Sequence, residues 1–251
     1  MIRIHVADAV GTITFDRPEV HNAFDDEFGR RFHEALGTVK ERDDVRVVVL
    51  RGEGKSFCSG RDVRQMGERP PGVTDYSIMT EGQKKIRLMV EMGKPIIAAL
   101  KGAVIGGGAE YALAADIRIA APDTKIALPE VNYGLAVDQG GSALLESLIG
   151  PSRTKLMLLT GRRVDAETAL KWGLVDQIVA AEQLDEEVAS LASEIAAKPW
   201  RAVTAAKELV DELWAPKIRA AIQRELVYQL ALFGSEDFQA LREARRMARA
   251  G

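Results

Sequence analysis

Residues able to do acid–base chemistry gather in two stretches near the middle of the chain. Glu110 lies inside the apolar stretch GGGAEYALAAD, where a charge is costly unless it is paired or functional. Glu130 and Asp138 lie among apolar residues and glycines in ALPEVNYGLAVDQGG. Carboxyl groups in such surroundings can be held in different protonation states, which general acid and base catalysis requires. Simple exposure to solvent is the usual explanation for any one acid, and Glu110 fits that explanation least well.

The triplet Gly106–Gly108 precedes a stretch that is typical of a helix. Unpaired N–H groups and the positive end of the helix dipole favour a negatively charged oxygen at such a position. A close-packed turn between a strand and a helix explains the triplet equally well. The spacing does not match a dinucleotide-binding GxGxxG pattern.

A third loop, RGEGKSFCSGRDV at residues 51–63, follows a strand-like run. It is not a nucleotide phosphate loop, because the glycine required five positions before Gly54 is Val49. Cys58 is better explained as a small apolar residue than as a nucleophile, since none of the three early histidines is an obvious base for it. The SGRD turn either exposes a backbone N–H group or is an ordinary surface turn.

The elements that must position these loops alternate between strand and helix. A hairpin is predicted from residues 2–6 and 12–15, and the following strands at 45–50, 95–100 and 117–120 alternate with helices at 25–42, 75–93 and 107–115. This order indicates parallel strands joined by right-handed crossovers, with ligands bound at the carboxyl ends of the strands. Beyond residue 140 helices dominate, at 141–149, 152–160, 165–172, 182–197, 201–214, 217–232 and 236–249, with one strand-like segment at 174–179.

Composition narrows the class of protein. The 251 residues are 47% hydrophobic and 28% charged, with a net charge of −3, which is typical of a globular chain with a substantial core. The slightly negative net charge disfavours nucleic acid as a partner. The single cysteine excludes an internal disulfide and a thiolate zinc cluster. With no signal peptide and no membrane-spanning run, a cytoplasmic protein is expected.

Six segments, in order and spacing, resemble the crotonase (enoyl-CoA hydratase/isomerase) superfamily over essentially the whole chain. They are FDRPEVHNAF, SFCSGRDV, KPIIAALKGAVIGGGAEYALAADIRIA, PEVNYGLAVDQGG, LTGRRVDAETALKWGLVDQIV and FGSEDFQALREARR. The resemblance implies an α/β fold, with a spiral of ββα units at 1–195 holding an acyl-CoA site and a helical trimerisation region at 196–251. It also implies a homotrimer or a hexamer built as a dimer of trimers, and a role in fatty acid metabolism.

The resemblance also implies a set of site residues. Two backbone N–H groups, those of Arg61 and Gly107, would stabilise an enolate formed from the acyl-CoA thioester, a charge that fixed donors stabilise well. Coenzyme A is part of the substrate, so neither a separate cofactor nor a metal is expected. The residues implied to bind substrate or coenzyme A are Ala23, Arg61, Asp62, Val63, Arg64, Gly106 and Gly107.

Two reactions follow from the resemblance. Hydratases of the family use two glutamates, at the positions of Glu110 and Glu130, to add water across the C2=C3 bond of a trans-2-enoyl-CoA. Enoyl- and dienoyl-CoA isomerases with a similar loop use a glutamate and an aspartate, at the positions of Glu130 and Asp138, to move a proton between carbons. Because both glutamates are present, the sequence favours the hydratase. A non-catalytic acyl-CoA-binding homologue is a third hypothesis, against which the three acids argue.

Overall fold

A six-stranded sheet forms the centre of the molecule. The computed structural model describes residues 1–64 and 71–250. Strand β1 pairs antiparallel with β2, and all further neighbours in the order β1-β2-β3-β4-β6-β9 are parallel. The strands are β1 (Ile2–Ala7), β2 (Val10–Phe15), β3 (Val47–Gly52), β4 (Ile96–Leu100), β6 (Ile117–Ala120) and β9 (Gln177–Ile178). The predicted hairpin and the predicted parallel arrangement are therefore confirmed.

A second sheet is small and lies beside the first. It has the order β5-β7-β8, formed by β5 (Ala103–Ile105), β7 (Lys125–Ala127) and β8 (Val164–Asp165). The sequence pattern did not predict these strands, because two or three residues are too few to show a periodicity. Strand β5 matters for function, since it leads directly into the glycine triplet.

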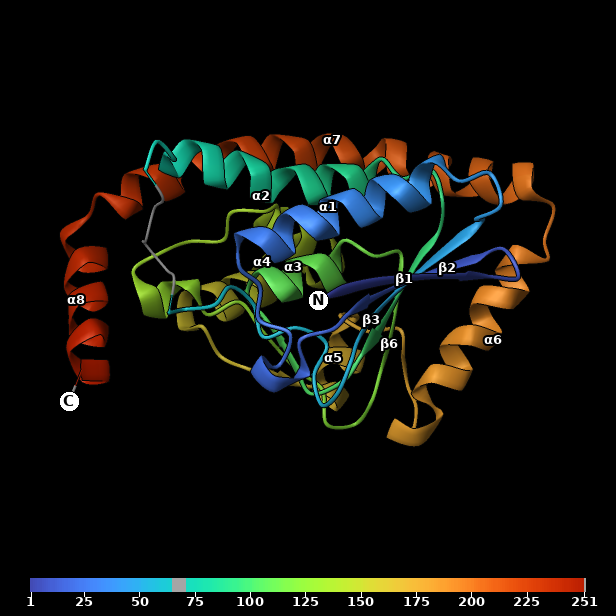
Figure 1. The fold of residues 1–251 in the computed structure, drawn as a ribbon, viewed down its shortest axis with the longest axis horizontal. Coiled ribbons are helices and arrows are strands. Elements are labelled where there is room, and N and C mark those ends of the chain that lie inside the picture. The colour runs from blue at the N-terminus through green and yellow to red at the C-terminus, as the bar shows by residue number, and fades with distance from the viewer. Residues whose placement is uncertain (65–70, 251) are drawn as a thin grey trace.

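Helices cover both faces of the central sheet (Figure 1). On one face, α1 (Asp26–Glu41), α2 (Asp75–Val90) and α3 (Gly107–Leu113) bury the larger core cluster. This cluster includes aromatic rings in edge-to-face contact, such as Phe15 and Phe32, whose centroids lie 4.9 Å apart. On the other face, α6 (Leu184–Ala196) packs Val188 against Val49 and Ile97. Strand β3 is buried on both faces, as its run of β-branched residues predicts.

The later helices differ from expectation at one proline. The predicted helices at 201–214 and 217–232 are one continuous helix, α7 (Trp200–Phe233), with Pro216 inside it. The missing N–H of a proline usually ends or kinks a helix. Here Ile218 and Ile222, which follow the proline, are fully buried, and this packing holds the helix across it. The predicted interruption near residue 150 is present, because Gly150 has a non-helical φ of 74° just before Pro151 in α4 (Gly141–Thr160).

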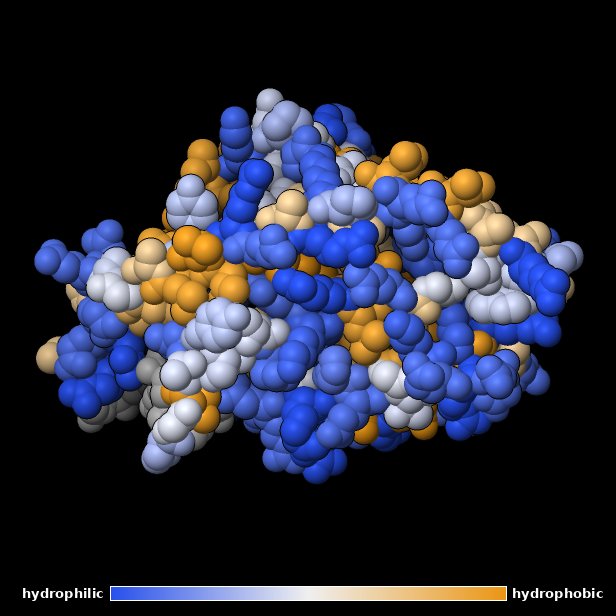
Figure 2. Space-filling view, turned by 90° about the horizontal axis from the view of Figure 1, so that it is seen from above, coloured by the Kyte–Doolittle hydropathy of each residue, from blue (hydrophilic) through white to orange (hydrophobic). Residues whose placement is uncertain are grey.

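The remaining helices are α5 (Ala166–Trp172) and α8 (Glu236–Ala250). None of the helices among the described residues is long and apolar enough to cross a lipid bilayer. Figure 2 shows apolar patches among charged side chains on the face formed by α7 and α2, and α7 exposes Leu209, Val210 and Leu213. The trimer or hexamer and the division at residue 195 stay predictions. Sedimentation of the purified chain would test the first of them.

Candidate active site

A cavity of about 660 Å³ opens between α1, α2 and the amino end of α3. The loop at 59–61 and the segment at 129–139 complete its walls, and the carboxyl end of α7 closes one side. The loops that follow β3 and β5 both reach this cavity. The cavity therefore lies at the carboxyl ends of these strands, where parallel sheets usually bind ligands.

Glu130 contributes one acid to the cavity. It begins a short 3-10 helix, Glu130–Tyr133, and its Oε2 atom is buried with no hydrogen-bond partner among the described residues. Burial raises the pKa of its carboxyl to about 8, and the negative charges of Asp138 and Glu225 add to the rise, while a backbone hydrogen bond opposes it. Glu130 is therefore largely protonated at neutral pH and able to donate a proton.

Asp138 contributes the second acid to the same cavity. Burial is the main cause that raises the pKa of its carboxyl to about 7, and repulsion from Glu225 adds to it. The positive charges of Arg61 and Lys85 act in the opposite direction. Two neighbouring acids with pKa values near neutrality titrate as a pair, so one of them is protonated while the other is ionised.

Glu110 is placed differently from these two acids. It is fully buried, and it does not belong to the cavity wall formed by the described residues. Its Oε1 atom accepts hydrogen bonds from the backbone N–H of Gln139 (3.0 Å) and of Gly141 (3.1 Å). Burial raises its pKa well above the ordinary value, and the charges of Asp138 and Glu130 raise it further. The carboxyl thus holds the loop that carries Asp138 and lies close enough to couple with both acids.

Three side chains fix the loop that carries Asp138. Gln83 of α2 donates to the carbonyl of Asp138 (2.8 Å), and Gln229 of α7 accepts from the N–H of Ala136 (3.0 Å). Glu225 of α7 accepts from the N–H groups of Gly140 (2.5 Å) and Ser142 (2.9 Å), and from the Ser142 hydroxyl. It thereby caps the amino end of α4. No sequence pattern indicates these roles, because the three residues lie far from the loop along the chain.

Replacing Glu225 by alanine is expected to destabilise the protein. The change leaves the buried N–H of Gly140 and the partly buried N–H and hydroxyl of Ser142 without an acceptor, and a buried unsatisfied group costs on the order of 1–3 kcal/mol. Urea unfolding should show a clearly lower midpoint for this variant. Glu212→Ala, an exposed acid on the same helix, is the matched control and should change the unfolding free energy by less than about 0.5 kcal/mol.

The backbone around Arg61 leaves one N–H group free. The N–H of Phe24 donates to Gly60 O and that of Asp62 donates to Phe24 O, both at 2.9 Å. In this parallel pairing the N–H of Arg61 lies on the side away from Phe24, and no acceptor for it is found in the described part of the chain. The adjacent segment runs alongside β5, with Cys58 paired to Val104.

The glycine triplet brings a second free N–H group to the same wall of the cavity. Gly107 is the first residue of α3, and its N–H has no backbone acceptor among the described residues, as expected for the first turn of a helix. A Cβ on Gly107 would lie 2.7 Å from Phe24 Cζ and 2.8 Å from Gln139 Nε2. Gly106 has a φ of 55° and a ψ of −130°, a conformation open only to glycine. At Gly108 close packing alone is sufficient, since a Cβ would lie 2.6 Å from Cys58 O.

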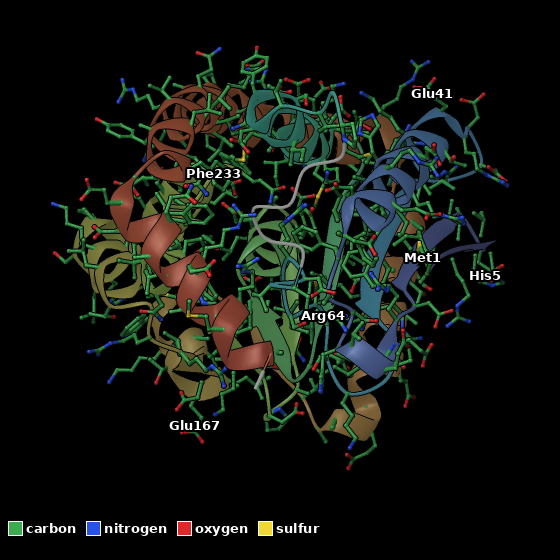
Figure 3. All side chains as sticks on the ribbon, turned by 60° about the vertical axis from the view of Figure 1, so that its left-hand side comes forward. Met1, His5, Glu41, Arg64, Glu167 and Phe233 are labelled. Carbon is green, nitrogen blue, oxygen red and sulfur yellow. The ribbon has the colours of Figure 1, made fainter. Side chains whose placement is uncertain are left out.

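The residues implied to bind substrate or coenzyme A differ in their position relative to the cavity. Arg61, Val63, Gly106 and Gly107 line the cavity. Ala23 and Asp62 are buried beside it, and Asp62 holds Arg64 through an ion pair of 2.6 Å. Arg64 is labelled in Figure 3 and is largely exposed, with no other anion bound to it among the described residues. The substrate- or coenzyme A-binding roles of all these residues stay predictions.

Cys58 behaves as the small apolar residue that the sequence predicts. The thiol is fully buried, donates to Asn22 O at 3.2 Å and has its pKa raised to about 12 by burial. Such a thiol is not a nucleophile at neutral pH.

Comparison with known proteins places this architecture. A family model described as enoyl-CoA hydratase/isomerase matches residues 5–247. The chain is 32% identical to 1,2-epoxyphenylacetyl-CoA isomerase of Escherichia coli (strain K12) over 94% of its own length and 91% of that protein. It is 36% identical to (E)-benzylidenesuccinyl-CoA hydratase of Thauera aromatica, covering 82% and 80% of the two chains. A crystal structure of an enoyl-CoA hydratase/isomerase from Xanthobacter autotrophicus Py2 superimposes with a TM-score of 0.89 at 30% identity, covering 98% and 93%.

Proposed function

Because the chain belongs to the enoyl-CoA hydratase/isomerase (crotonase) family, whose enzymes act on acyl-CoA thioesters, we propose that it is a double-bond isomerase of enoyl-CoA substrates. The sequence favours the hydratase, and the placement of the acids reverses that preference. One observation carries the proposal: Glu130 and Asp138 line the cavity together, whereas the carboxyl of Glu110 is bonded to the backbone at residues 139 and 141.

The reaction needs only proton transfers. In a 3-enoyl-CoA, ionised Asp138 removes a proton from C2, and the C–H electron pair forms a C1–C2 double bond while charge moves onto the thioester oxygen. The N–H groups of Arg61 and Gly107 stabilise this oxygen by hydrogen bonding. Protonated Glu130 then donates its proton to C4, the double bond settles between C2 and C3, and the enolate collapses to the thioester. One proton has left and one has been added, so the mass is unchanged.

Hydration of a 2-enoyl-CoA is the second candidate. It is supported by the coupling of Glu110 to both other acids and by the name of the similar hydratase from Thauera aromatica. In that reaction one glutamate activates water for attack on C3 and the other supplies the proton to C2, so the product gains the mass of one water.

Mass-resolved turnover separates these functions. The purified chain would be incubated with a panel of 2-enoyl-, 3-enoyl- and dienoyl-CoA thioesters, and each product would be analysed by mass spectrometry. Isomerisation gives a product of unchanged mass with altered ultraviolet absorption, and hydration adds one water. Hydration as the main product would overturn the isomerase proposal. Binding without turnover of any substrate would identify a non-catalytic homologue.

The pH dependence of kcat/KM should be bell-shaped. Activity needs Asp138 ionised and Glu130 protonated, and their pKa values are raised to about 7 and about 8. Activity should therefore rise as pH approaches 7 and fall above 8. Because the two acids are coupled, the two apparent pKa values of this profile belong to the pair and not to either residue alone. Initial rates in buffers from pH 5 to 10 would measure this profile. A plateau extending from pH 5 to 10 would contradict it.

A further inference from the structure

The cavity contains a cation that the proposed reaction does not use. Lys85 of α2 lines the cavity, and only 4% of the residue is exposed to solvent. Its ammonium group donates to the carbonyl of Glu81, one turn earlier in the same helix, at 3.0 Å. No carboxylate of the described residues lies within ion-pair distance of it. A buried ammonium with a single acceptor is costly, and the cost is offset when an anion occupies the neighbouring space.

The acids around Lys85 already have other partners. Asp26 is paired with Arg61 at 2.7 Å, and Glu34 is paired with Arg30 at 2.5 Å. The carboxylate of Glu81 is paired with Lys84. Asp138 is close enough for the Lys85 charge to lower its pKa, but these two side chains form no ion pair. Among the described residues that line the cavity, Lys85 is therefore the cation left without a counter-ion.

Helix α1 lies beside the ammonium group. A Cβ on Gly29 of α1 would lie 3.4 Å from Lys85 Nζ, which places the ammonium against this helix. One turn further along α1, His33 also lines the cavity, and its Nδ1 atom is buried with no partner among the described residues.

His33 supplies polarity without adding charge. Burial and the positive charge of Lys85 lower the pKa of its imidazole, so the ring is neutral at pH 7. A neutral imidazole has one N–H donor and one acceptor. The part of the cavity between α1 and α2 therefore offers the unpaired positive charge of Lys85 and an uncharged ring, while the acids Glu130 and Asp138 belong to the segment at 129–139.

We propose that the acyl group of the substrate carries a carboxylate remote from its thioester, and that Lys85 binds this carboxylate inside the cavity. The proposal rests on the acyl-CoA function proposed above and narrows it to monothioesters of dicarboxylic acids. The cavity that holds Arg61 and Gly107 also reaches α1 and α2, so a thioester bound at the two N–H groups can place the far end of its acyl chain at Lys85. A charge-assisted hydrogen bond to the buried Lys85 selects a carboxylate over a methyl group.

Binding of saturated thioesters tests the proposal without requiring turnover. Hexanedioyl-CoA and hexanoyl-CoA are a matched pair that differ only in the terminal group, and a series of four to eight carbons covers the unknown distance. Calorimetry at pH 7 should give a Kd for at least one ω-carboxyacyl-CoA that is about tenfold lower than for its alkyl counterpart. In Lys85→Met the two members of that pair should bind within about threefold of each other.

Lys84→Met is the matched control. It removes the same charge from the adjacent residue, whose side chain is exposed and paired with Glu81, and should keep the preference intact. Lys85→Gln is a second variant, included in case methionine at this position disturbs folding. Melting curves should show that both Lys85 variants are folded. The preference should also fade above pH 8, because the pKa of Lys85 is lowered to about 8 by burial.

The outcomes separate the two proposals. Equal binding of carboxylate and alkyl thioesters by the wild type overturns the role of Lys85 and leaves the acyl-CoA function standing. A carboxylate preference that survives in Lys85→Met also overturns it. If Lys85 only tunes Asp138, its variants would shift the pH profile of turnover and leave the binding preference absent or unaltered. No binding of any acyl-CoA would overturn both proposals.

Discussion

Replacing Asp138 by asparagine is expected to lower kcat for double-bond isomerisation by about 10²–10⁴-fold, the usual contribution of one positioned acid–base group. Asparagine has nearly the same shape but cannot take a proton from carbon. The backbone carbonyl of residue 138 still accepts the hydrogen bond from Gln83, so the loop should stay in place. Initial rates with the substrate identified by the mass-resolved panel would measure the loss, with saturated acyl-CoA binding as a check that affinity is retained.

The companion variants of this experiment distinguish the two reactions. Under the isomerase proposal Glu110→Gln should cost much less activity than Asp138→Asn, because Glu110 holds the loop and does not line the cavity. Under the hydratase alternative the order reverses, and Asp138→Gly should retain activity. Asp43→Asn, an exposed acid outside the site, should behave as the wild type.

Stability provides an independent check on the same substitution. The pKa of Asp138 is raised from 3.8 to about 7 in the folded protein. Between about pH 4 and 7 the folded state therefore binds more protons than the unfolded state, and the unfolding free energy falls as pH rises. Asparagine lacks this effect. Asp138→Asn should consequently melt at a higher temperature than the wild type at pH 8 and show little gain at pH 4. A variant that is both inactive and less stable at pH 8 would contradict the assigned environment.

Local patterns predicted much of the fold because each long element is amphipathic or fully apolar. Strand β3 and helix α1 lie within two residues of their predicted bounds, and Asp25 caps α1 by accepting from Phe28 N, as its residue type indicates. The short strands β5, β7 and β8 could not be predicted, since their pairing is decided by distant segments. The continuity of α7 through Pro216 depends on burial of Ile218 and Ile222, which no local rule contains.

The residues of the candidate site could likewise be predicted only in part. Residue types and family resemblance single out Glu130, Asp138 and Gly107, and all three line the cavity. The resemblance pairs Glu110 with Glu130 in a hydratase and Glu130 with Asp138 in an isomerase, and the hydrogen bonds of Glu110 to the loop are visible only in the structure. Lys85 was missed because a lysine in an amphipathic helix is normally solvated, so its burial is visible only in three dimensions.

Replacing Gly107 by alanine is expected to lower kcat by about 10²–10³-fold, comparable to losing one donor of an oxyanion hole. The added Cβ would lie 2.7 Å from Phe24 Cζ and 2.8 Å from Gln139 Nε2, so the first turn of α3 or both side chains must move. A shift of this kind misdirects the N–H of residue 107, which is needed most when charge develops on the thioester oxygen. Because that charge exists only during the reaction, kcat should fall far more than the affinity for a saturated acyl-CoA.

Gly37→Ala is the matched control for this substitution. Gly37 lies inside α1, and a Cβ there would have no neighbour within 4 Å. Alanine at that position should leave kcat unchanged and raise the unfolding free energy by roughly 0.5–1 kcal/mol, since glycine is unfavourable inside a helix. If Gly107→Ala lowers stability yet retains full kcat, the N–H of Gly107 does not stabilise the enolate, and the close contacts with Phe24 and Gln139 alone explain the glycine.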